Sequence, residues 1–205
     1  IFVSYKNTKI LIDCGCTCKK IKENLNAIGE KIGEINAVFI THSHGDHTSA
    51  LPVLLKNTNA GICATNGTLC ELYNKNDEYR SVMDTFNDKI FCIEEKQTVN
   101  FFDITLQPFG VPHDAAQTVG YNITAGEKTL SILTDIGYLR ENLYEDVKGR
   151  ELVFLESNHD LMALENCKYT MSLKQRILSR GGHLSNKDAG VFSSYLAQNG
   201  VKRII

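Results

Sequence analysis

Residues 41–47 read Thr41-His42-Ser43-His44-Gly45-Asp46-His47, and they directly follow the apolar run Ala37-Val38-Phe39-Ile40. The apolar run predicts a short buried strand that ends where the histidines begin. Because alternate side chains of an extended backbone point to the same side, we expect His42 and His44 to face one space. Three of the six histidines fall in this stretch, which favours a metal-binding loop over an ordinary polar surface loop.

Gly45 separates the two halves of this loop. A positive φ at Gly45 would turn the chain sharply and bring Asp46 and His47 to the space that the first two histidines face. A helix is expected to follow, with leucines at positions 51, 54 and 55 on one face. Two imidazoles, then a carboxylate and a further imidazole, are enough to begin two metal sites.

Two later residues also follow predicted strands. Pro112 fixes the backbone after a strand over residues 104–109, just before His113, and a third imidazole would complete a tetrahedral zinc position. Asp135 follows a hairpin of residues 119–124 and 129–134. A carboxylate at that strand end suits a ligand shared by two cations, whereas capping of the next helix is the alternative.

The loop of residues 41–47 resembles the signature of the metallo-β-lactamase fold, a superfamily of metal-dependent hydrolases. Further segments resemble its YycJ/WalJ branch, whose members are regarded as nuclease-like phosphodiesterases. These segments, in chain order, are Phe109-Gly110-Val111-Pro112-His113-Asp114-Ala115-Ala116, Thr134-Asp135-Ile136-Gly137-Tyr138, Glu156-Ser157-Asn158-His159-Asp160 and Gly182-His183-Leu184-Ser185-Asn186. The resemblance implies an α+β fold, a four-layer αββα sandwich with metals at one edge between the sheets.

The order of the predicted elements agrees with this fold class. Hairpins and buried strands come first, with helices interleaved, which predicts two β-sheets packed face to face and helices on both outer faces. We expect one domain over residues 1–205. Residues 74–88 are polar and are expected to be irregular, as a lid or an insertion.

Both ends of the sequence are strand-like. Residues 1–3 are apolar and lack an initial Met, and residues 201–205 predict another strand with nothing after it. We therefore expect a domain truncated at both ends, a piece of a longer protein. The resemblance implies that a seventh metal ligand, a histidine, lies in a loop beyond Ile205.

Composition bounds the cellular setting. The net charge is −2, so any nucleic-acid binding must come from a local patch. No apolar run approaches the roughly 20 residues of a membrane span, so no membrane partner is expected. Seven cysteines without a small disulfide scaffold favour the reducing cytoplasm. The residues leave the oligomeric state open.

The resemblance implies a two-metal site with six ligands. These are His42, His44 and His113 on one ion, Asp46 and His47 on the other, and Asp135 bridging. Imidazole and carboxylate ligands suit zinc or manganese. Two such cations would hold a hydroxide at neutral pH and clamp an electrophilic centre, which supports hydrolysis without identifying the bond.

The candidate catalytic residues are Asp46, His183 and His159. His183 lies in a segment that resembles the His-Ser-Thr motif of phosphodiesterase relatives, where the histidine protonates a leaving oxygen or holds the scissile phosphate. The competing interpretation makes His183 the seventh ligand. His159 lies in a strand-exit loop on the same side, where it serves the site or simply holds its loop.

Residues near the first strand pair have supporting roles. Asp13 matches an acidic position of the superfamily and is expected to hydrogen-bond the metal loop. Cys14, Cys16 and Cys18 alternate, but their spacing is not that of a structural zinc site. We expect them to pack as small apolar groups where the strand passes under the loop.

Three hypotheses for the function follow, in order of preference. The first, which the resemblance implies, is a metal-dependent phosphodiesterase that acts on nucleic acid as an exonuclease. One stretch has five basic residues and no acidic ones, and it is either a patch for a phosphate backbone or an ordinary solvated helix face: Lys168, Lys174, Arg176, Arg180 and Lys187. The second is a glyoxalase-II-like hydrolase of a small thioester or cyclic ester. The third is a metal-binding regulatory protein without catalysis, against which the complete ligand loop argues.

Overall fold

A computed structural model describes residues 1–205. The chain divides into two compact units, the first formed by Ile1–Ile104 with Ala115–Gln117 and the second by Thr105–Asp114 with Thr118–Ile205. The expectation of a single domain stays a prediction. No helix in the structure combines the length and the apolar composition that crossing a membrane requires.

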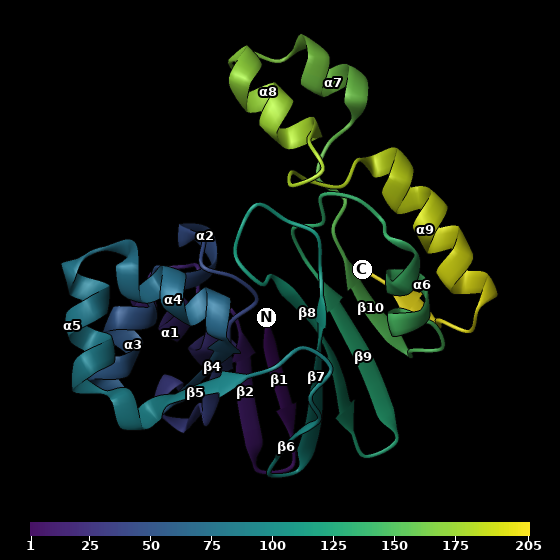
Figure 1. Ribbon diagram of the computed structural model, residues 1–205. Helices are drawn as coiled ribbons and strands as arrows, with labels where there is room; N and C mark the ends of the chain where they lie inside the picture. The colour runs from purple at the N-terminus through teal and green to yellow at the C-terminus, as the bar shows by residue number, and fades with distance from the viewer. The chain divides into compact units, whose positions relative to one another are not determined.

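The first unit contains a five-stranded sheet in the order β1-β2-β3-β4-β5 (Figure 1). Its strands are β1 (Phe2–Tyr5), β2 (Thr8–Ile12), β3 (Ala37–Phe39), β4 (Gly61–Thr65) and β5 (Ile90–Ile93). The first two strands form an antiparallel hairpin and the others are parallel. The register pairs Ile12 with Phe39, so the chain leaves β2 and β3 at adjacent points, at Asp13 and Ile40.

Five α-helices belong to this unit: α1 (Cys18–Ala27), α2 (Gly45–Thr48), α3 (Leu51–Asn57), α4 (Asn66–Lys75) and α5 (Asp77–Thr85). Two short 3₁₀ helices, η1 (Ile32–Glu34) and η2 (Asn87–Lys89), complete it. Apolar side chains of the helices and of the sheet form one buried cluster, which includes Leu25, Leu54, Leu72 and Val82.

The expectation that residues 74–88 are irregular is wrong, because most of them form α5. Asn76 is the N-cap of this helix, and its side-chain oxygen accepts a hydrogen bond of 3.0 Å from the backbone N–H of Tyr79, as is typical of this position. Tyr79, Val82 and Met83 are buried on one face. Three apolar residues at helical spacing among many polar ones are a weak signal in sequence.

The second sheet runs in the order β11-β10-β9-β8-β7-β6. Its strands are β6 (Val99–Phe101), β7 (Ile104–Gly110), β8 (Val119–Ala125), β9 (Lys128–Leu133), β10 (Leu152–Leu155) and β11 (Arg203–Ile204). β8 and β9 form the predicted antiparallel hairpin, and β10 lies parallel to β9 and to β11. Leu133 pairs with Leu155, so the loops that carry Asp135 and Glu156 start side by side.

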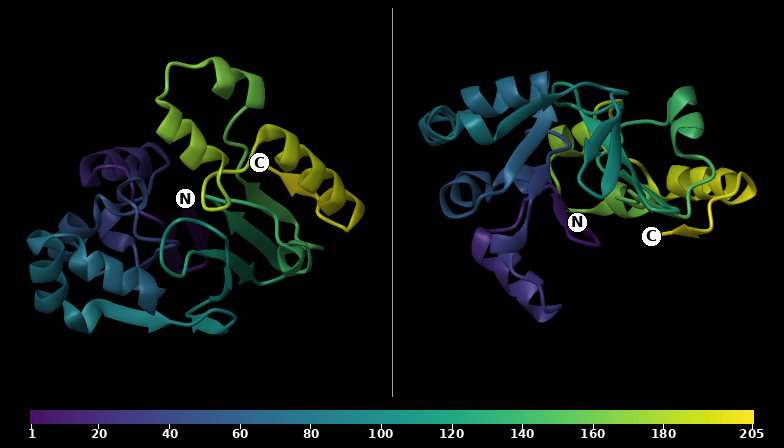
Figure 2. Two further views of the ribbon diagram at one scale, coloured as in Figure 1. Left: turned by 45° about the horizontal axis from the view of Figure 1, so that its top comes forward. Right: turned by 90° about the horizontal axis from the view of Figure 1, so that it is seen from below.

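The helices of the second unit are α6 (Glu141–Val147), α7 (Leu161–Asn166), α8 (Met171–Leu178) and α9 (Asn186–Gln198). Leu143 of α6 and Phe192 of α9 join the buried cluster of this unit. Ser185 caps α9 as predicted, its hydroxyl accepting from the N–H of Asp188 at 3.1 Å. By contrast, α7 and α8 stand apart from the sheet of this unit (Figures 1 and 2).

Candidate functional site

Asp13 holds the start of the metal loop, as the sequence predicts. One carboxylate oxygen accepts from the Thr41 N–H at 2.8 Å, and the other accepts from the Thr41 hydroxyl at 2.9 Å and from His47 Nδ1 at 2.8 Å. Asp13 has a φ of 62°, which the short polar side chain of Asp tolerates better than most. Three acceptor contacts on one carboxylate therefore set the conformation of the loop.

The three histidines of the loop lie together. His42 is fully buried, and its Nε2 is 3.1 Å from Nδ1 of His44. The ring centroids of His42 and His47 are 4.1 Å apart. Because the Nδ1–H of His47 donates to the Asp13 carboxylate, Nε2 is the nitrogen left for a metal, which is the usual arrangement of a metal-bound histidine.

The turn in the loop does not depend on a positive φ at Gly45, so that expectation is wrong. His44 has φ −59° and ψ 153°, and α2 begins directly at Gly45. The change from extended to helical backbone therefore redirects the chain. Asp46, in the first turn of α2, has a side chain that is 80% exposed, with an oxygen 4.0 Å from His47 Nε2.

The chain after β2 passes directly under α2. The Cys14 N–H donates to the His47 carbonyl at 2.7 Å, and the Ala50 N–H donates to the Cys14 carbonyl at 3.0 Å. A Cβ on Gly15 would lie 1.4 Å from the Asp46 carbonyl oxygen. Cys14 is buried, which raises the pKa of its thiol, while Cys16 is exposed. This arrangement favours the prediction that the cysteines pack as small residues and disfavours a metal site formed by them.

Residues of α4 and α5 brace the loop, and sequence reasoning missed them. The Lys75 ammonium donates to the Ser43 carbonyl at 2.6 Å and to the Thr48 hydroxyl at 3.0 Å. The Ser43 hydroxyl donates to Glu71, and the Tyr79 hydroxyl donates to the Thr48 carbonyl at 2.9 Å. Partial burial lowers the pKa of Lys75. A lysine in the last turn of a polar helix carries no sequence signal for this role.

His113 follows β7 in the second unit. Its Nδ1 lies 3.0 Å from the Gly182 carbonyl oxygen, and its side chain is 1% exposed. A carbonyl oxygen can only accept a hydrogen bond, so Nδ1 of His113 carries the proton. Nε2 is then the nitrogen that can bind a metal. Asp114 lies 3.3 Å from Nε2 through one carboxylate oxygen.

Asp135 follows β9 with a φ of 54°. The next residues are tied on both sides, since the Ile136 N–H donates to Glu156 at 2.7 Å and the Gly137 N–H donates to the Pro112 carbonyl at 2.6 Å. A left-handed backbone at a non-glycine residue is a strained conformation that persists where surrounding contacts hold it. These contacts therefore fix the backbone beside Asp135, whose side chain is buried.

Glu156 contacts the site residues, although its sequence motif did not predict a role for it. It follows β10, and its Oε1 lies 2.7 Å from Nδ1 of His183. The same nitrogen is 3.4 Å from an oxygen of Asp135, and the ligand atoms of these three residues lie within 4.8 Å of one another. The hydrogen bond to Glu156 raises the pKa of His183, against the opposing effect of burial. A carboxylate at a strand end was the available signal.

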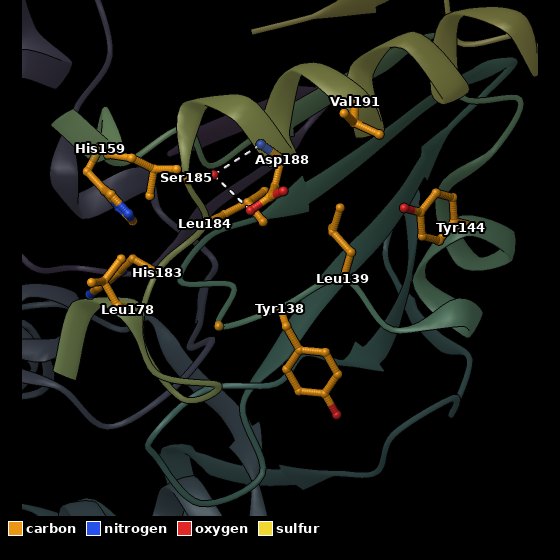
Figure 3. Close-up of a pocket in the computed structure, with 12 residues that line it drawn as sticks. Tyr138, Leu139, Tyr144, His159, Leu178, His183, Leu184, Ser185, Asp188 and Val191 are labelled. Atoms are coloured by element: carbon orange, nitrogen blue, oxygen red, sulfur yellow. Dashed lines mark hydrogen bonds between the residues drawn. The ribbon is translucent and has the colours of Figure 1, made fainter. Parts of the chain in front are cut away.

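His159 lies in the loop after β10, beside the segment that follows His183. The Asn158 N–H donates to the Leu184 carbonyl at 3.0 Å, and the Asn186 N–H donates to the His159 carbonyl at 2.8 Å, so its backbone runs beside Ser185. Both ring nitrogens are excluded from solvent and have no hydrogen-bond partner. Desolvation lowers the pKa of His159. His159 and His183 line one pocket, and Figure 3 shows both residues on the same side of it.

The basic residues of the predicted patch contact different partners. Arg176 donates to both oxygens of Asp114, at 2.6 and 3.1 Å. Lys174 donates to the Glu165 carbonyl at 2.6 Å, and the Arg180 guanidinium lies 3.9 Å from the ring centre of Tyr138. Lys168 and Lys187 are exposed. Arg176 therefore supports the His113 loop more than it offers a free charge.

The structure thus brings the site residues together within each unit. His42, His44 and His47 meet in the first unit, with Asp46 at the exposed start of α2. In the second unit the ring centroids of His113 and His183 are 5.3 Å apart, and Asp135 contacts His183. The arrangement of all six ligands as one two-metal site stays a prediction.

Comparisons with known proteins agree with this reading. The model of the Beta-lactamase superfamily domain matches residues 8–196. Exodeoxyribonuclease WalJ of Streptococcus pneumoniae serotype 2 is 33% identical over 203 residues, 99% of this chain and 74% of that protein. Exodeoxyribonuclease YycJ of Bacillus anthracis is 29% identical over 204 residues, 100% of this chain and 75% of that protein.

A solved structure shows the same fold. Zn²⁺-bound PqqB from Methylobacterium extorquens superimposes with a TM-score of 0.72 at 19% identity, over 99% of this chain and 75% of that one. At this identity the likeness concerns the fold alone, and it confirms the α+β sandwich class predicted from the sequence. The family match and the likeness to WalJ confirm the predicted relationship to the metallo-β-lactamase superfamily and its YycJ/WalJ branch. The chain belongs to the metallo-β-lactamase superfamily.

Proposed function

We propose that the chain is a metal-dependent phosphodiesterase that hydrolyses nucleic acid from an end, as an exonuclease. One observation carries the proposal: the chain is similar along its whole length to proteins named exodeoxyribonucleases. The local chemistry agrees, because a histidine held by a carboxylate lies beside Asp135, and such a pair suits proton transfer to a leaving oxygen.

The proposed cofactors are two divalent ions, zinc or manganese. The proposed ligands are His42, His44 and His113 for one ion, Asp46 and His47 for the other, and Asp135 for both. The residues fit such ions, because His47 and His113 each commit Nδ1 to an oxygen acceptor and keep Nε2 for coordination. When bound, such ions activate water as a nucleophile and polarise the phosphoryl oxygens.

The remaining steps belong to side chains of the chain. Glu156 binds Nδ1 of His183, so Nε2 is left to donate a proton to the leaving oxygen or to hold the scissile phosphate. We assign His183 to the acid because its segment resembles the His-Ser-Thr motif of phosphodiesterase relatives. An Nδ1 held by a carboxylate suits a metal ligand equally well, so the metal content of His183→Ala tests this choice. Asp46 presents its carboxylate at the exposed start of α2, and His159 completes the proposed catalytic set from the wall of the pocket.

Nucleic acid is the proposed partner and the cytoplasm the proposed compartment. Lys168 and Lys187 are exposed cations near the His183 loop in sequence, and exposed lysines meet phosphates through charge alone. All seven cysteines are free thiols, which fits a reducing compartment.

The test is hydrolysis by the purified protein loaded with manganese or zinc. The substrates are end-labelled duplex DNA, single-stranded DNA and a glutathione thioester. We expect short products to leave DNA ends, with turnover abolished by chelation. His183→Ala should retain the bound metals and lose most of the turnover. Faster hydrolysis of the thioester than of DNA would reject the proposal and favour the glyoxalase-II-like alternative.

A further inference from the structure

A pocket of about 380 Å³ lies beside His183 in the second unit (Figure 3). Its volume falls in the roughly 300–1,000 Å³ range of small-molecule sites. The loop after Asp135 provides one wall through Tyr138 and Leu139, and α9 provides another through Val191. One side of His183 faces Asp135, and the same residue lines the pocket, so the pocket adjoins the proposed site of hydrolysis.

The lining of this pocket suits an uncharged, partly aromatic group. Leu139, Leu178 and Val191 give it apolar walls, and no lysine or arginine lines it. The one carboxylate of the lining, on Asp188, would repel a phosphate. The guanidinium of Arg180 lies 3.9 Å from the ring centre of Tyr138, a cation–π contact that holds this aromatic ring in place.

His159 supplies the polar groups that a pocket of this kind needs for orientation. Buried polar atoms in folded proteins are nearly always hydrogen-bonded, yet both ring nitrogens of His159 lack a partner. A neutral imidazole offers one donor and one acceptor. Because the two ring nitrogens point away from each other, one of them at a time can pair with a donor or an acceptor on the edge of a nucleobase.

We propose that this pocket binds the base and sugar of the nucleotide at the end of a DNA strand, while the scissile phosphate lies at His183. The inference rests on the proposed function and explains why cleavage starts at an end. A strand that continued through the pocket would have to place a phosphate among apolar side chains and beside Asp188. A terminal nucleoside carries no further phosphate and fits there.

The first test removes the base from the substrate. Two duplexes are compared that differ only in whether the terminal nucleotide carries its base or is abasic. We expect the abasic end to lower kcat/KM by at least about tenfold, since base stacking and edge contacts contribute strongly to binding. Val191→Trp fills the pocket from a side chain that is 60% exposed, so the fold should tolerate it, and this variant should cleave both ends at the same low rate.

Gln198→Trp is the matched control, because it places the same bulky side chain on an exposed position of α9 that does not line the pocket. It should keep the preference for the end that carries a base. Equal cleavage of both ends by the unaltered protein would overturn the pocket assignment and leave the proposed nuclease function intact.

The second test needs neither turnover nor metal. Saturation-transfer NMR with deoxyadenosine should detect binding to the unaltered protein and to Gln198→Trp, and no binding to Val191→Trp. If deoxyadenosine binds in this pattern while DNA is not hydrolysed, the pocket assignment stands and the nuclease proposal fails. Absence of binding to the unaltered protein at millimolar deoxyadenosine would overturn the inference.

Discussion

Nδ1 of His183 lies 2.7 Å from Oε1 of Glu156, across 27 residues of sequence. The other oxygen of Glu156 accepts from the N–H groups of Ile136 and Leu184, at 2.7 and 3.1 Å. One carboxylate therefore orients the imidazole and also ties the loop of Asp135 to the loop of His183. Glu156 thus orients the ring of the proposed acid, whose backbone N–H also donates to the Ile177 carbonyl at 2.9 Å.

Glu156→Gln should slow DNA hydrolysis by about 100-fold, in the range of a lost general acid. The amide can still accept a hydrogen bond, but it does not stabilise a positively charged imidazole as a carboxylate does. Steady-state kcat on end-labelled duplex DNA measures the loss. A phosphodiester with a p-nitrophenolate leaving group needs little protonation, so its hydrolysis should fall much less. A variant that lost bound metal by elemental analysis would show that Glu156 is a ligand instead.

Asp135→Asn should remove the proposed bridging carboxylate while it keeps the backbone. The φ of 54° at this position is one that Asn adopts and that Ala adopts at a cost of roughly 1–2 kcal/mol. We expect loss of one metal and of hydrolysis, with thermal stability of the metal-free protein nearly unchanged. Elemental analysis and a melting curve give both readouts. Two metals per chain in this variant would contradict the assignment.

Arg176 and Lys168 should behave differently although both belong to the basic stretch. Arg176→Ala releases Asp114, which is 3.3 Å from Nε2 of His113, so turnover of DNA and of a small phosphodiester should both fall. Lys168→Ala should reduce the salt slope of DNA binding by about one and leave the small substrate unaffected. Fluorescence anisotropy at several salt concentrations measures the slope. The reverse pattern would make Arg176 a phosphate contact.

Gly15→Ala should disrupt the metal loop. The added Cβ would lie 1.4 Å from the Asp46 carbonyl oxygen, and neither backbone segment is free to move because of the hydrogen bonds of Cys14. We expect a loss of at least about 2 kcal/mol in the free energy of unfolding, within the range of named backbone effects. Urea unfolding measures it. Gly33→Ala, where a Cβ meets nothing within 4 Å, is the control and should change stability by less than about 0.5 kcal/mol. Equal effects would mean that the close approach is not present in solution.

Several positions of the candidate site could be predicted because their signals are local. The loop of residues 41–47 shows its histidines within a few positions after an apolar run, and His113 and Asp135 each follow a strand. The cap at Ser185 also depends on residues three positions apart. Spacing of this kind follows from strand and helix geometry, so it can be read before the chain is folded.

The supports of the site were not predictable, since each one joins residues far apart in sequence. Lys75 reaches Ser43 across 32 residues, and Arg176 reaches Asp114 across 62. Neither contact has a local pattern, because long charged side chains look alike on any exposed helix. The same holds for the pairing of Glu156 with His183 and for the pocket beside them, which exist only once the parallel strands β9 and β10 bring their exit loops together.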